Sequence, residues 1–458
     1  MAECRVIVVG AGPAGVRCAE TLVAAGVRPI VIDEGQRDGG QIYRRQPENF
    51  TRTYATLYGT EARRAQRLHA SFDALRARID YRPQTLVWNI AAGQVHVIQG
   101  TQTAALPFDA LVICAGATDR LMPVEGWNLA GVYSLGGSQI ALKSQACAIG
   151  RKVVFAGTGP LLYLVAAQYV KAGAKVEAVL DTSPYGLRLR ALPRLLARPG
   201  VLLKGLTLVA RLKRAGVRIE AGITPVRITG DPDTGVDGIA FRDARGVSHT
   251  LSCDAVALGY HLRPELQLAD LARCAFRFDA ETRQWLPEID ADGRSSTQGV
   301  YLAGDGARVL GADGAEAAGR LAALAALRDL GMPADEVQMQ RLRRTLGVMD
   351  RFRRGLAQAF PWPHQQAAAL PDDAVVCRCE TIRAGELRRV TREMGAEEIN
   401  RAKAFSRVGM GRCQGRYCAH AAAEVVAHAA GIPVETVGRM RAQAPVKPLT
   451  MAAQENAT

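Results

Sequence analysis

Long hydrophobic runs are missing from this chain of 458 residues. The richest apolar stretch, Pro160 to Val170, is short and is interrupted by Gln168, so we expect no transmembrane segment. The sequence passes from Met1 almost directly into the apolar segment Val6–Val9, which leaves no room for a signal peptide. These absences predict a cytoplasmic protein.

Aromatic residues are also scarce, at 5% of the chain, although the net charge is +14. Nucleic-acid-binding surfaces interleave basic residues with exposed aromatics, so nucleic acid is not expected as a partner. The densest basic stretch, 341–354, carries Leu342, Leu346, Met349 and Phe352 at helical spacing. This pattern favours the solvated face of an amphipathic helix, and an acidic partner subunit or an anionic ligand remains an alternative.

Ten cysteines occur in a chain that lacks a secretion signal, so thiols or metal ligands are expected rather than disulfides. Four of the ten lie close together near the C-terminus and are considered below. The other six are isolated in apolar or strand-like settings, where we expect them to be packed in the interior. They are Cys4, Cys18, Cys114, Cys147, Cys253 and Cys274.

The N-terminal segment combines a short apolar strand, a glycine-rich turn, a helical segment and a second strand that ends in an acid. Gly10 permits the tight turn, Gly12 lets the backbone approach a diphosphate, and Gly15 lets helix and strand pack closely. Free N–H groups at the start of the helix favour phosphate. Asp33, 18 residues after Gly15, is placed to bind the adenine ribose. The segment therefore predicts a dinucleotide site.

Two later strands decide which dinucleotide is expected. Residues 109–117 form a buried strand that ends in a small-residue turn, and residues 299–306 form another that ends at Gly304 and Asp305. These segments, together with Gly39–Tyr43, resemble fingerprints of two-dinucleotide-domain flavoproteins such as the thioredoxin reductase and ferredoxin reductase group. The resemblance implies FAD, with Asp305 on the ribityl chain and the helix after Gly314 directed at the flavin ring. The expected FAD-binding residues are Gly10, Gly12, Pro13, Ala14, Gly15, Asp33, Glu34, Gly40, Gln41, Ala115, Gly116, Gly304 and Asp305.

Residues 152–181 repeat the strand, glycine turn, helix and strand, and in a reductase of this group they would hold NAD(P)H. The third glycine position is Leu162, and the strand-end position that corresponds to Asp33 is read as Leu180, with Asp181 one residue late. Leucine hinders close packing and offers no hydrogen bond to a ribose. We expect the fold to survive with pyridine nucleotide binding impaired.

No catalytic group for substrate oxidation is identified in the sequence. A Cys-x-x-Cys pair is absent from both nucleotide regions, so thiol–disulfide chemistry is unsupported. His261 is the best-placed histidine, but a loop histidine without a known partner is more often structural.

The C-terminal region, after the proline-rich joint 360–363, contains Cys377-x-Cys379 and, after 33 intervening residues, Cys413-x4-Cys418. Val375 to Cys379 is predicted to be a strand, which places both thiols of the first pair on one face. The glycines around Cys413 leave N–H groups free to bind sulfur. Ligand type and spacing favour a 2Fe–2S cluster on Cys377, Cys379, Cys413 and Cys418, with structural zinc or unligated thiols as alternatives. The segment also resembles the bacterioferritin-associated ferredoxin-like domain, which binds such a cluster.

The combination of an impaired second nucleotide domain and a four-cysteine module resembles the alpha subunit of heteromeric flavin-dependent amine dehydrogenases. This family includes D-hydroxyproline dehydrogenase, the octopine and nopaline oxidases, hydrogen cyanide synthase and dye-linked L-proline dehydrogenase. The resemblance covers the chain from Arg5 to about Gln443. It implies a catalytic beta subunit of the flavin amine oxidase type that oxidises a C–N bond, while the alpha subunit relays electrons to a downstream acceptor. It also allows a small ferredoxin-like subunit and an additional FMN at a subunit interface.

The expected fold class is α/β, with two dinucleotide-binding domains and a small C-terminal iron–sulfur domain. A stand-alone NAD(P)H-dependent reductase with flavin and cluster is the alternative function, and a non-catalytic assembly subunit is a third. The expected boundaries are 1–118 with 291–330 for the FAD domain, 119–290 for the NAD(P)-type domain, 331–370 for a basic helix and linker, 371–443 for the cluster domain, and 444–458 for a flexible tail.

Overall fold

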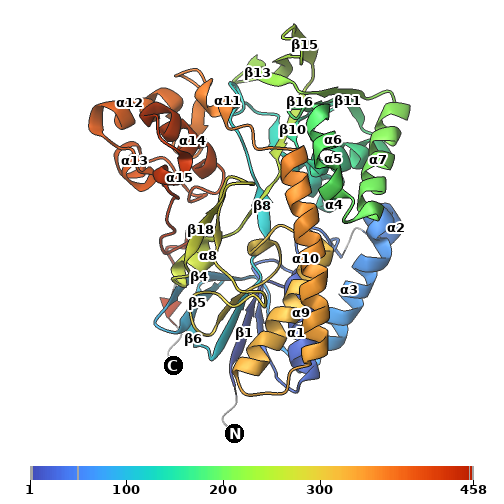
Figure 1. Ribbon diagram of the computed structural model, residues 1–458, viewed down its shortest axis with the longest axis vertical. Helices are drawn as coiled ribbons and strands as arrows, with labels where there is room; N and C mark the ends of the chain where they lie inside the picture. The colour runs from blue at the N-terminus through green and yellow to red at the C-terminus, as the bar shows by residue number, and fades with distance from the viewer. Residues whose placement is uncertain (1–3, 49–50, 453, 456–458) are drawn as a thin grey trace.

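The computed structural model describes residues 4–48, 51–452 and 454–455. Two parallel sheets stand one above the other, and a small helical module lies to one side of them (Figure 1). The α/β class with two dinucleotide-type domains is therefore confirmed. No helix in the described ranges is both long enough and apolar enough to cross a membrane.

The first domain is built on the parallel sheet β20-β7-β1-β2-β3. Buried aliphatic runs such as β1 are typical of strands that are covered on both faces. Helices α1, α3 and α9 cover one face, and strands β4–β6 with α8 cover the other. The bounds are β1 Val6–Val9, α1 Pro13–Ala24, β2 Ile30–Ile32, α2 Tyr54–Tyr58, α3 Ala62–Leu75, β3 Asp80–Arg82, β4 Thr85–Ala91, β5 Gln94–Gln99, β6 Gln102–Pro107, β7 Ala110–Ile113, α8 Gln267–Leu271, β20 Val300–Leu302 and α9 Ala312–Asp329.

The second domain repeats this plan with the parallel sheet β12-β11-β10-β16-β9. Helices α4, α5 and α7 cover one face, and the antiparallel strands β13–β15 cover the other. The bounds are β9 Val132–Ser134, α4 Leu135–Ser144, β10 Lys152–Thr158, α5 Pro160–Lys171, β11 Lys175–Asp181, α6 Tyr185–Leu195, α7 Pro199–Arg214, β12 Arg218–Ala221, β13 Thr224–Asp231, β14 Gly235–Arg242, β15 Ser248–Ser252 and β16 Ala255–Tyr260.

Two antiparallel strands, β8 (Ala117–Asp119) and β17 (Leu262–Pro264), connect the domains. After β17 the chain returns to the first domain, where Leu268, Ala269 and Cys274 lie in its core. Strands β18 (Phe276–Asp279) and β19 (Gln284–Pro287) then form a hairpin. The second domain consequently ends near residue 261, and the expected boundary at 290 is wrong.

Helix α10 (Glu336–Ala359) runs along both domains, as Figure 1 shows. It contacts α9 of the first domain and α6 of the second. At the second contact a Cβ on Gly355 would lie 3.1 Å from the backbone nitrogen of Leu195, so the two helices approach closely. The basic stretch 341–354 is helical as predicted.

The C-terminal module packs on Trp362, Met122 and Tyr260, so the proline-rich joint belongs to its core. Its elements are α11 Gln365–Ala368, β21 Val375–Cys377, β22 Ile382–Arg383, α12 Ala384–Met394, α13 Ile399–Ser406, α14 Ala419–Ala430 and α15 Val434–Val437. The expected flexible tail is wrong for the described part of 444–458. Val446 is 3% exposed in the first domain's core, and β23 (Gln454–Glu455) pairs with β6.

Candidate functional site

The glycine turn after β1 has the geometry that the sequence predicted. Gly10 has φ +103°, and a Cβ on it would lie 2.4 Å from the carbonyl oxygen of Cys114. A Cβ on Gly15 would lie 1.7 Å from the carbonyl oxygen of Gly10, so no side chain fits between strand and helix. A Cβ on Gly12 would meet only the Cα of Gly40, at 3.6 Å. Gly10 and Gly15 are thus required by packing, whereas Gly12 faces free space.

Helix α1 begins at Pro13 without a side-chain cap and without an acidic residue in its first turn. Its first N–H groups, including that of Ala14, therefore have no intrahelical acceptor and favour an anion. The loop that contains Gly40 lies close to the glycine turn. A Cβ on Gly40 would lie 3.0 Å from the Cα of Gly12, so a larger residue would crowd the turn. Gln41 follows this glycine and is exposed.

The carboxylate of Asp33 lies beside this turn. It accepts hydrogen bonds from the backbone N–H of Ala11 at 2.5 Å and of Gly35 at 2.6 Å. Burial raises the pKa of Asp33, and the two N–H donors act in the opposite direction. The neighbouring Glu34 is exposed and forms an ion pair with Lys447.

The ends of β7 and β20 bring further predicted residues to the same edge of the sheet. A Cβ on Gly304 would lie 2.8 Å from the Cβ of Ala14. Ala115 and Gly116 stand beside the 3₁₀ turn Gly304–Gly306, since a Cβ on Gly306 would lie 3.1 Å from the nitrogen of Gly116. In doubly wound sheets this edge is where dinucleotides bind.

Asp305 is enclosed in this edge and accepts hydrogen bonds from the N–H groups of Leu310 and Gly311, at 2.9 and 3.0 Å. Burial raises its pKa to about 6. Added hydroxyl donors would stabilise the charged carboxylate, so the sugar hydroxyls of a nucleotide suit this position. The glycine cradle, the free helix start and the two acids together fit FAD.

The second nucleotide turn corrects one prediction. The pairing of β10 with β11 shifts between Val153 and Val154, which places Asp181 opposite Gly157 and Leu180 opposite Ala156. In the first domain Val9 of β1 lies opposite Ile32 of β2, so the next pair along is Gly10 and Asp33. Gly157 is the counterpart of Gly10, and Asp181 is therefore the counterpart of Asp33. The assignment of Leu180 to the ribose position is wrong, because a β-bulge absorbs the extra residue.

Asp181 is nevertheless fully used inside the protein. One carboxylate oxygen accepts from the Thr158 hydroxyl and the Ser183 N–H, both at 2.8 Å. The other accepts from the Tyr163 hydroxyl at 2.8 Å and the Arg188 guanidinium at 2.7 Å. The side chain is 0% exposed, so four internal donors saturate it and none of its lone pairs faces a ribose.

His261 lies beside this turn. A Cβ on Gly159, the N-cap of α5, would lie 3.2 Å from Nδ1 of His261. The other ring nitrogen hydrogen-bonds to the carbonyl oxygen of Phe360 at 2.6 Å. Burial lowers the pKa of His261 to about 4, so the ring is neutral and structural, as the sequence predicted. At the second motif, the acid and the glycine turn are thus both in contact with the protein's own side chains.

The four C-terminal cysteines are brought together, although not by the predicted strand. Strand β21 ends at the buried Cys377, and the exposed Cys379 lies in the following turn, so alternation along one strand does not align them. Instead, the thiol of Cys418 lies within hydrogen-bonding reach of Cys377 and Cys413, and Cys413 reaches Cys379.

Backbone N–H groups surround these sulfurs. Cys377 accepts from Gly409 and Glu380, and Cys413 accepts from Gly415 and Tyr417. The hydrogen bond from the Cys418 thiol is the largest cause that lowers the pKa of Cys377 to about 6 and that of Cys413 to about 5. Both side chains therefore favour the thiolate, the form that ligates metal.

The four thiols form a row in the order Cys377, Cys418, Cys413 and Cys379, each within hydrogen-bonding reach of the next. Within the described residues, no group of three or more His, Cys, Asp or Glu side chains is gathered around one ion position. A two-iron cluster distributes its four thiolates over two metal atoms, so a row of sulfurs is compatible with it. Gly411 makes room for this arrangement, since a Cβ on it would lie 2.2 Å from the Cβ of Cys379.

Two contacts near the thiols were not predicted. The side chain of Arg416 donates to Glu265 at 2.9 Å and to the carbonyl oxygen of Cys413 at 3.2 Å, and the N–H of Glu265 donates to Gly116 at 2.9 Å. A chain of hydrogen bonds therefore joins the cysteine loop to the first dinucleotide site. Lys403, 7% exposed, lies near Cys418 and places a cation there. Only tertiary packing brings these residues together.

Of the six isolated cysteines, Cys18, Cys114, Cys253 and Cys274 are buried as expected, whereas Cys4 is partly exposed and Cys147 is exposed, so the prediction is wrong for these two. A cavity of about 520 Å³ lies between the helices of the two nucleotide domains and was not predicted. Its polar wall comprises Arg64, Arg198, Lys204 and Asp313, and Asp313 pairs with both arginines at 2.7 and 2.6 Å. The Arg198–Asp313 pair joins the second domain to the start of α9, and the Arg64–Asp313 pair lies within the first domain.

Comparisons with known proteins agree with this architecture. Residues 4–325 match the family described as pyridine nucleotide-disulphide oxidoreductase, and residues 376–456 match the sarcosine oxidase A3 domain. The solved structure of L-proline dehydrogenase from P. horikoshii superposes with a TM-score of 0.68 at 19% identity, covering 98% of this chain and 79% of that one. That likeness supports the fold.

Curated relatives span nearly the whole chain. An opine oxidase A subunit from Rhizobium meliloti is 38% identical, over 98% of this chain and 86% of the relative. The HcnB subunit of hydrogen cyanide synthase from Pseudomonas aeruginosa is 30% identical, over 99% of this chain and 98% of the relative. Both relatives are named as subunits of oxidising or synthesising enzymes.

Proposed function

Because this chain belongs to the pyridine nucleotide-disulphide oxidoreductases, and among them to the family of opine oxidase A subunits, we propose that it is an electron-transfer subunit. The family consists of oxidoreductases that work as parts of multi-subunit enzymes. The proposed enzyme oxidises the C–N bond of an amino acid, an imino acid such as D-hydroxyproline, or an opine. This chain carries FAD and a 2Fe–2S cluster, and a catalytic beta subunit of the flavin amine oxidase type binds the substrate.

The single observation that carries the proposal is the contrast between the two nucleotide turns. At the first turn, Gly12 faces free space and the start of α1 is uncapped. At the second, Asp181 has four internal donors and His261 lies against the turn. This contrast supports a flavin that receives its electrons from a source other than NAD(P)H.

FAD, when bound, supplies a two-electron acceptor that can release electrons one at a time. The start of α1 would bind its diphosphate, Asp33 would accept hydrogen bonds from the ribose, and Asp305 would accept from the ribityl chain. Gly12 and Gly40 leave the backbone free to approach. Ala115, Gly116 and Gly304 line the same edge of the sheet.

Cys377, Cys379, Cys413 and Cys418 would hold the cluster, which supplies one-electron transfer. The N–H donors around Cys377 and Cys413 would offset thiolate charge. The hydrogen bonds from Cys413 through Arg416 and Glu265 to Gly116 join this loop to the predicted flavin site, which supports electron transfer between the two. Structural zinc at the same thiols is the competing assignment.

The proposal includes a cytoplasmic location, a downstream electron acceptor and, at a subunit interface, room for an additional FMN or a small ferredoxin-like subunit. It includes no nucleic-acid partner. We assign recognition of the amine or opine to the catalytic subunit, because the sequence of this chain offers no recognisable base for substrate oxidation.

The test is anaerobic spectroscopy of the chain alone and in complex with its catalytic subunit. We expect NADH and NADPH to leave the flavin oxidised, and an amino acid or opine substrate to reduce it only in the complex. Iron and sulfide analysis with EPR of the reduced complex should then reveal a 2Fe–2S signal. Rapid bleaching by NADH would favour the stand-alone reductase, and zinc in place of iron would refute the cluster.

A further inference from the structure

The two helices that follow β11 have an unusual composition. Residues 185–214, here called the α6–α7 segment, contain no Asp or Glu. They contain ten leucines and eight cationic residues. The cations are Arg188, Arg190, Arg194, Arg198, Lys204, Arg211, Lys213 and Arg214. A segment that combines leucine with charge of one sign only is typical of helices that lie on anionic membrane surfaces.

Several of the leucines of the α6–α7 segment are exposed to solvent instead of being buried in the core. On α6 an exposed stripe follows the spacing i, i+4, i+7, i+11, and on α7 two further leucines project outward. Their exposed fractions are 73% for Leu189, 55% for Leu196, 62% for Leu203 and 60% for Leu206, with Tyr185 at 51% and Leu192 at 39%. Burying this much apolar surface against water-excluding material would be favourable.

The opposite faces of both helices are firmly packed. Ala191 and Leu195 of α6 are buried in a cluster with Phe352 of α10, and Leu212 of α7 is buried beside α5. Leu189 and Leu203 are therefore exposed although both helices are packed against the rest of the protein. The outward stripe is a second, separate apolar face.

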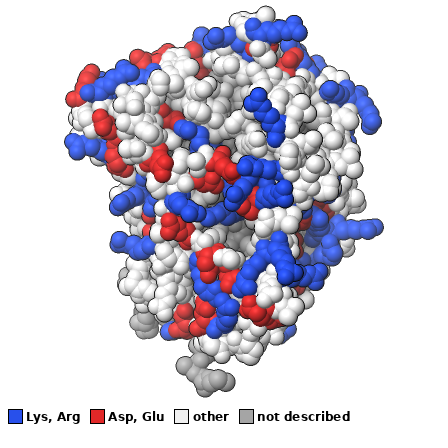
Figure 2. Space-filling view, viewed as in Figure 1, with Lys and Arg blue, Asp and Glu red and all other residues white. Residues whose placement is uncertain are grey.

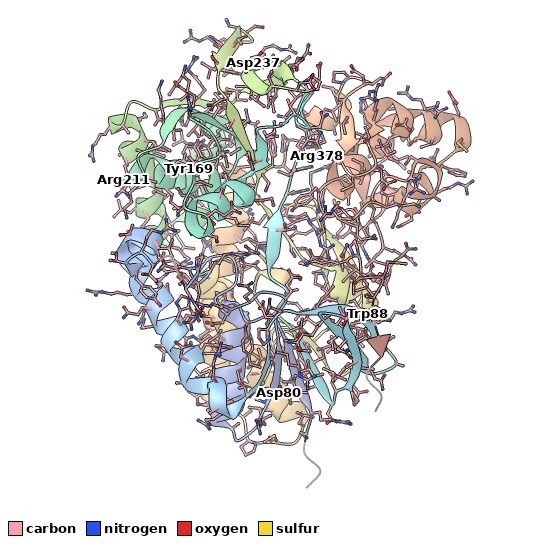
Figure 3. All side chains as sticks on the ribbon, turned by 180° about the vertical axis from the view of Figure 1, so that it is seen from behind. Asp80, Trp88, Tyr169, Arg211, Asp237 and Arg378 are labelled. Carbon is pink, nitrogen blue, oxygen red and sulfur yellow. The ribbon has the colours of Figure 1, made fainter. Side chains whose placement is uncertain are left out.

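The cations divide into two groups. Arg188, Arg194, Arg198 and Lys204 form ion pairs inward, with Asp181, Glu281, Asp313 and Glu61. The other four, Arg190, Arg211, Lys213 and Arg214, have no ion pair with any residue that the structure describes. Figure 3 places Arg211 at the outer edge of the molecule. Figure 2 shows Lys and Arg side chains projecting at the right-hand edge, the side on which α7 lies in Figure 1.

We propose that the α6–α7 segment docks this protein on an anionic lipid surface, with Leu189, Leu196, Leu203 and Leu206 entering the headgroup region and the four unpaired cations contacting lipid phosphates. A second copy of the chain is a poorer occupant, because a two-fold interface would oppose cations to cations with no acid in the segment. We prefer lipid to an acidic protein because a headgroup layer offers phosphates directly beside hydrocarbon, which matches exposed leucines flanked by unpaired cations.

The test uses the full-length protein and vesicles made of phosphatidylcholine alone or of phosphatidylcholine with an equal part of phosphatidylglycerol. We expect co-sedimentation with the anionic vesicles, weakening as salt is added, and none with the neutral ones. The double variant Leu203→Glu with Leu206→Glu should bind the anionic vesicles at least ~10-fold less well. Both positions are exposed, and unchanged thermal melting will confirm that the variant folds.

Two matched controls carry the same substitution at exposed apolar positions outside the segment. Val247→Glu lies in the turn between β14 and β15 at 52% exposure, and Val337→Glu lies at the far start of α10 at 80%. Both should bind like wild type. Equal binding by the leucine variant and wild type, or no binding of wild type to anionic vesicles, overturns the proposal.

Two further measurements identify a different occupant. If the leucine variant breaks a dimer in sedimentation velocity while vesicles remain unbound, the surface joins two copies and the proposal is wrong. If it abolishes copurification of the catalytic subunit without vesicle binding, a protein partner covers the surface and the proposal is again wrong. Vesicle binding requires no flavin, cluster or substrate, so its failure leaves the redox function untouched, and the reverse also holds.

Discussion

Gly12 and Gly15 stand three residues apart in one turn, yet replacing them with alanine should have opposite consequences. Gly12 has φ −78° and ψ −172°, a conformation that any residue adopts, and its added Cβ would meet only Gly40 Cα at 3.6 Å. Alanine is a weaker N-cap than glycine, so Gly12→Ala should lower the free energy of unfolding by no more than ~1 kcal/mol. The methyl group would nevertheless occupy the space through which a diphosphate approaches the backbone.

Gly15→Ala should act on the fold instead. Its Cβ would lie 1.7 Å from the carbonyl oxygen of Gly10, about half of an ordinary contact distance, so α1 must move away from β1. That movement is opposed on the other side by α9, where a Cβ on Gly319 would lie 2.0 Å from the carbonyl oxygen of Ala14. Overpacking between two fixed neighbours should cost ~3 kcal/mol.

Two assays separate these effects. Flavin absorbance of the purified proteins and of proteins reconstituted with FAD measures cofactor binding, and urea unfolding of the cofactor-free forms measures stability. We expect Gly12→Ala to unfold close to wild type and to bind FAD at least ~100-fold less tightly, equivalent to ~2.7 kcal/mol. A Gly12→Ala protein that retains full flavin, or a Gly15→Ala protein that unfolds like wild type, would refute the reasoning.

Three more predictions concern buried charges. Asp181→Ala should lower the free energy of unfolding in urea by ~3 kcal/mol, because it leaves Arg188 without its buried partner, and it should not allow NADH to reduce the flavin. Lys403→Met should lower the midpoint potential of the cluster by on the order of 60 mV, because a cation near Cys418 stabilises the reduced state. A redox titration monitored by EPR measures this potential. The control is Arg401→Met, at an exposed position of the same helix, which should leave the potential unchanged. The pKa of Asp305 in the folded protein is about 6, above its ordinary value of 3.8. Between these two pH values the folded state holds a proton that the unfolded state has lost. The free energy of unfolding of the cofactor-free protein should therefore fall by ~3 kcal/mol as pH rises through this range. Urea unfolding of Asp305→Asn across pH 4–7 should lack this slope, and an identical slope in the variant would contradict the assignment.

Sequence patterns were sufficient where the chemistry is local. The glycine turn, Asp33 and the helix start are contiguous or separated by one helix, and each has one steric or electrostatic reason for its residue type. The two short fingerprints at 109–117 and 299–306 were also recognisable, because parallel strands carry their turns to one edge of a sheet.

The errors arose where distant segments decide the geometry. A β-bulge moved Asp181 into register, and no spacing rule detects which residue of a strand will be extruded. Cys379 does not belong to the predicted strand, because the chain turns after Cys377. The four thiols are nevertheless close together, because Cys413 and Cys418, beyond 33 intervening residues, pack against the first pair. The tail from 444 was expected to be flexible, but Val446 is buried in the core of the first domain.

The amino-acid sequence by itself therefore determined the α/β class, the open dinucleotide turn and the identity of the four thiols. These depend on residue type and short-range spacing. Tertiary structure alone decided that internal donors saturate Asp181 at the second turn, that the cysteine loop contacts the first site through Arg416 and Glu265, and that the leucines of α6 and α7 face outward. The physical reason is the same in each case: hydrogen-bond saturation, burial and exposure depend on which distant segments pack together, and the order of residues does not specify that locally.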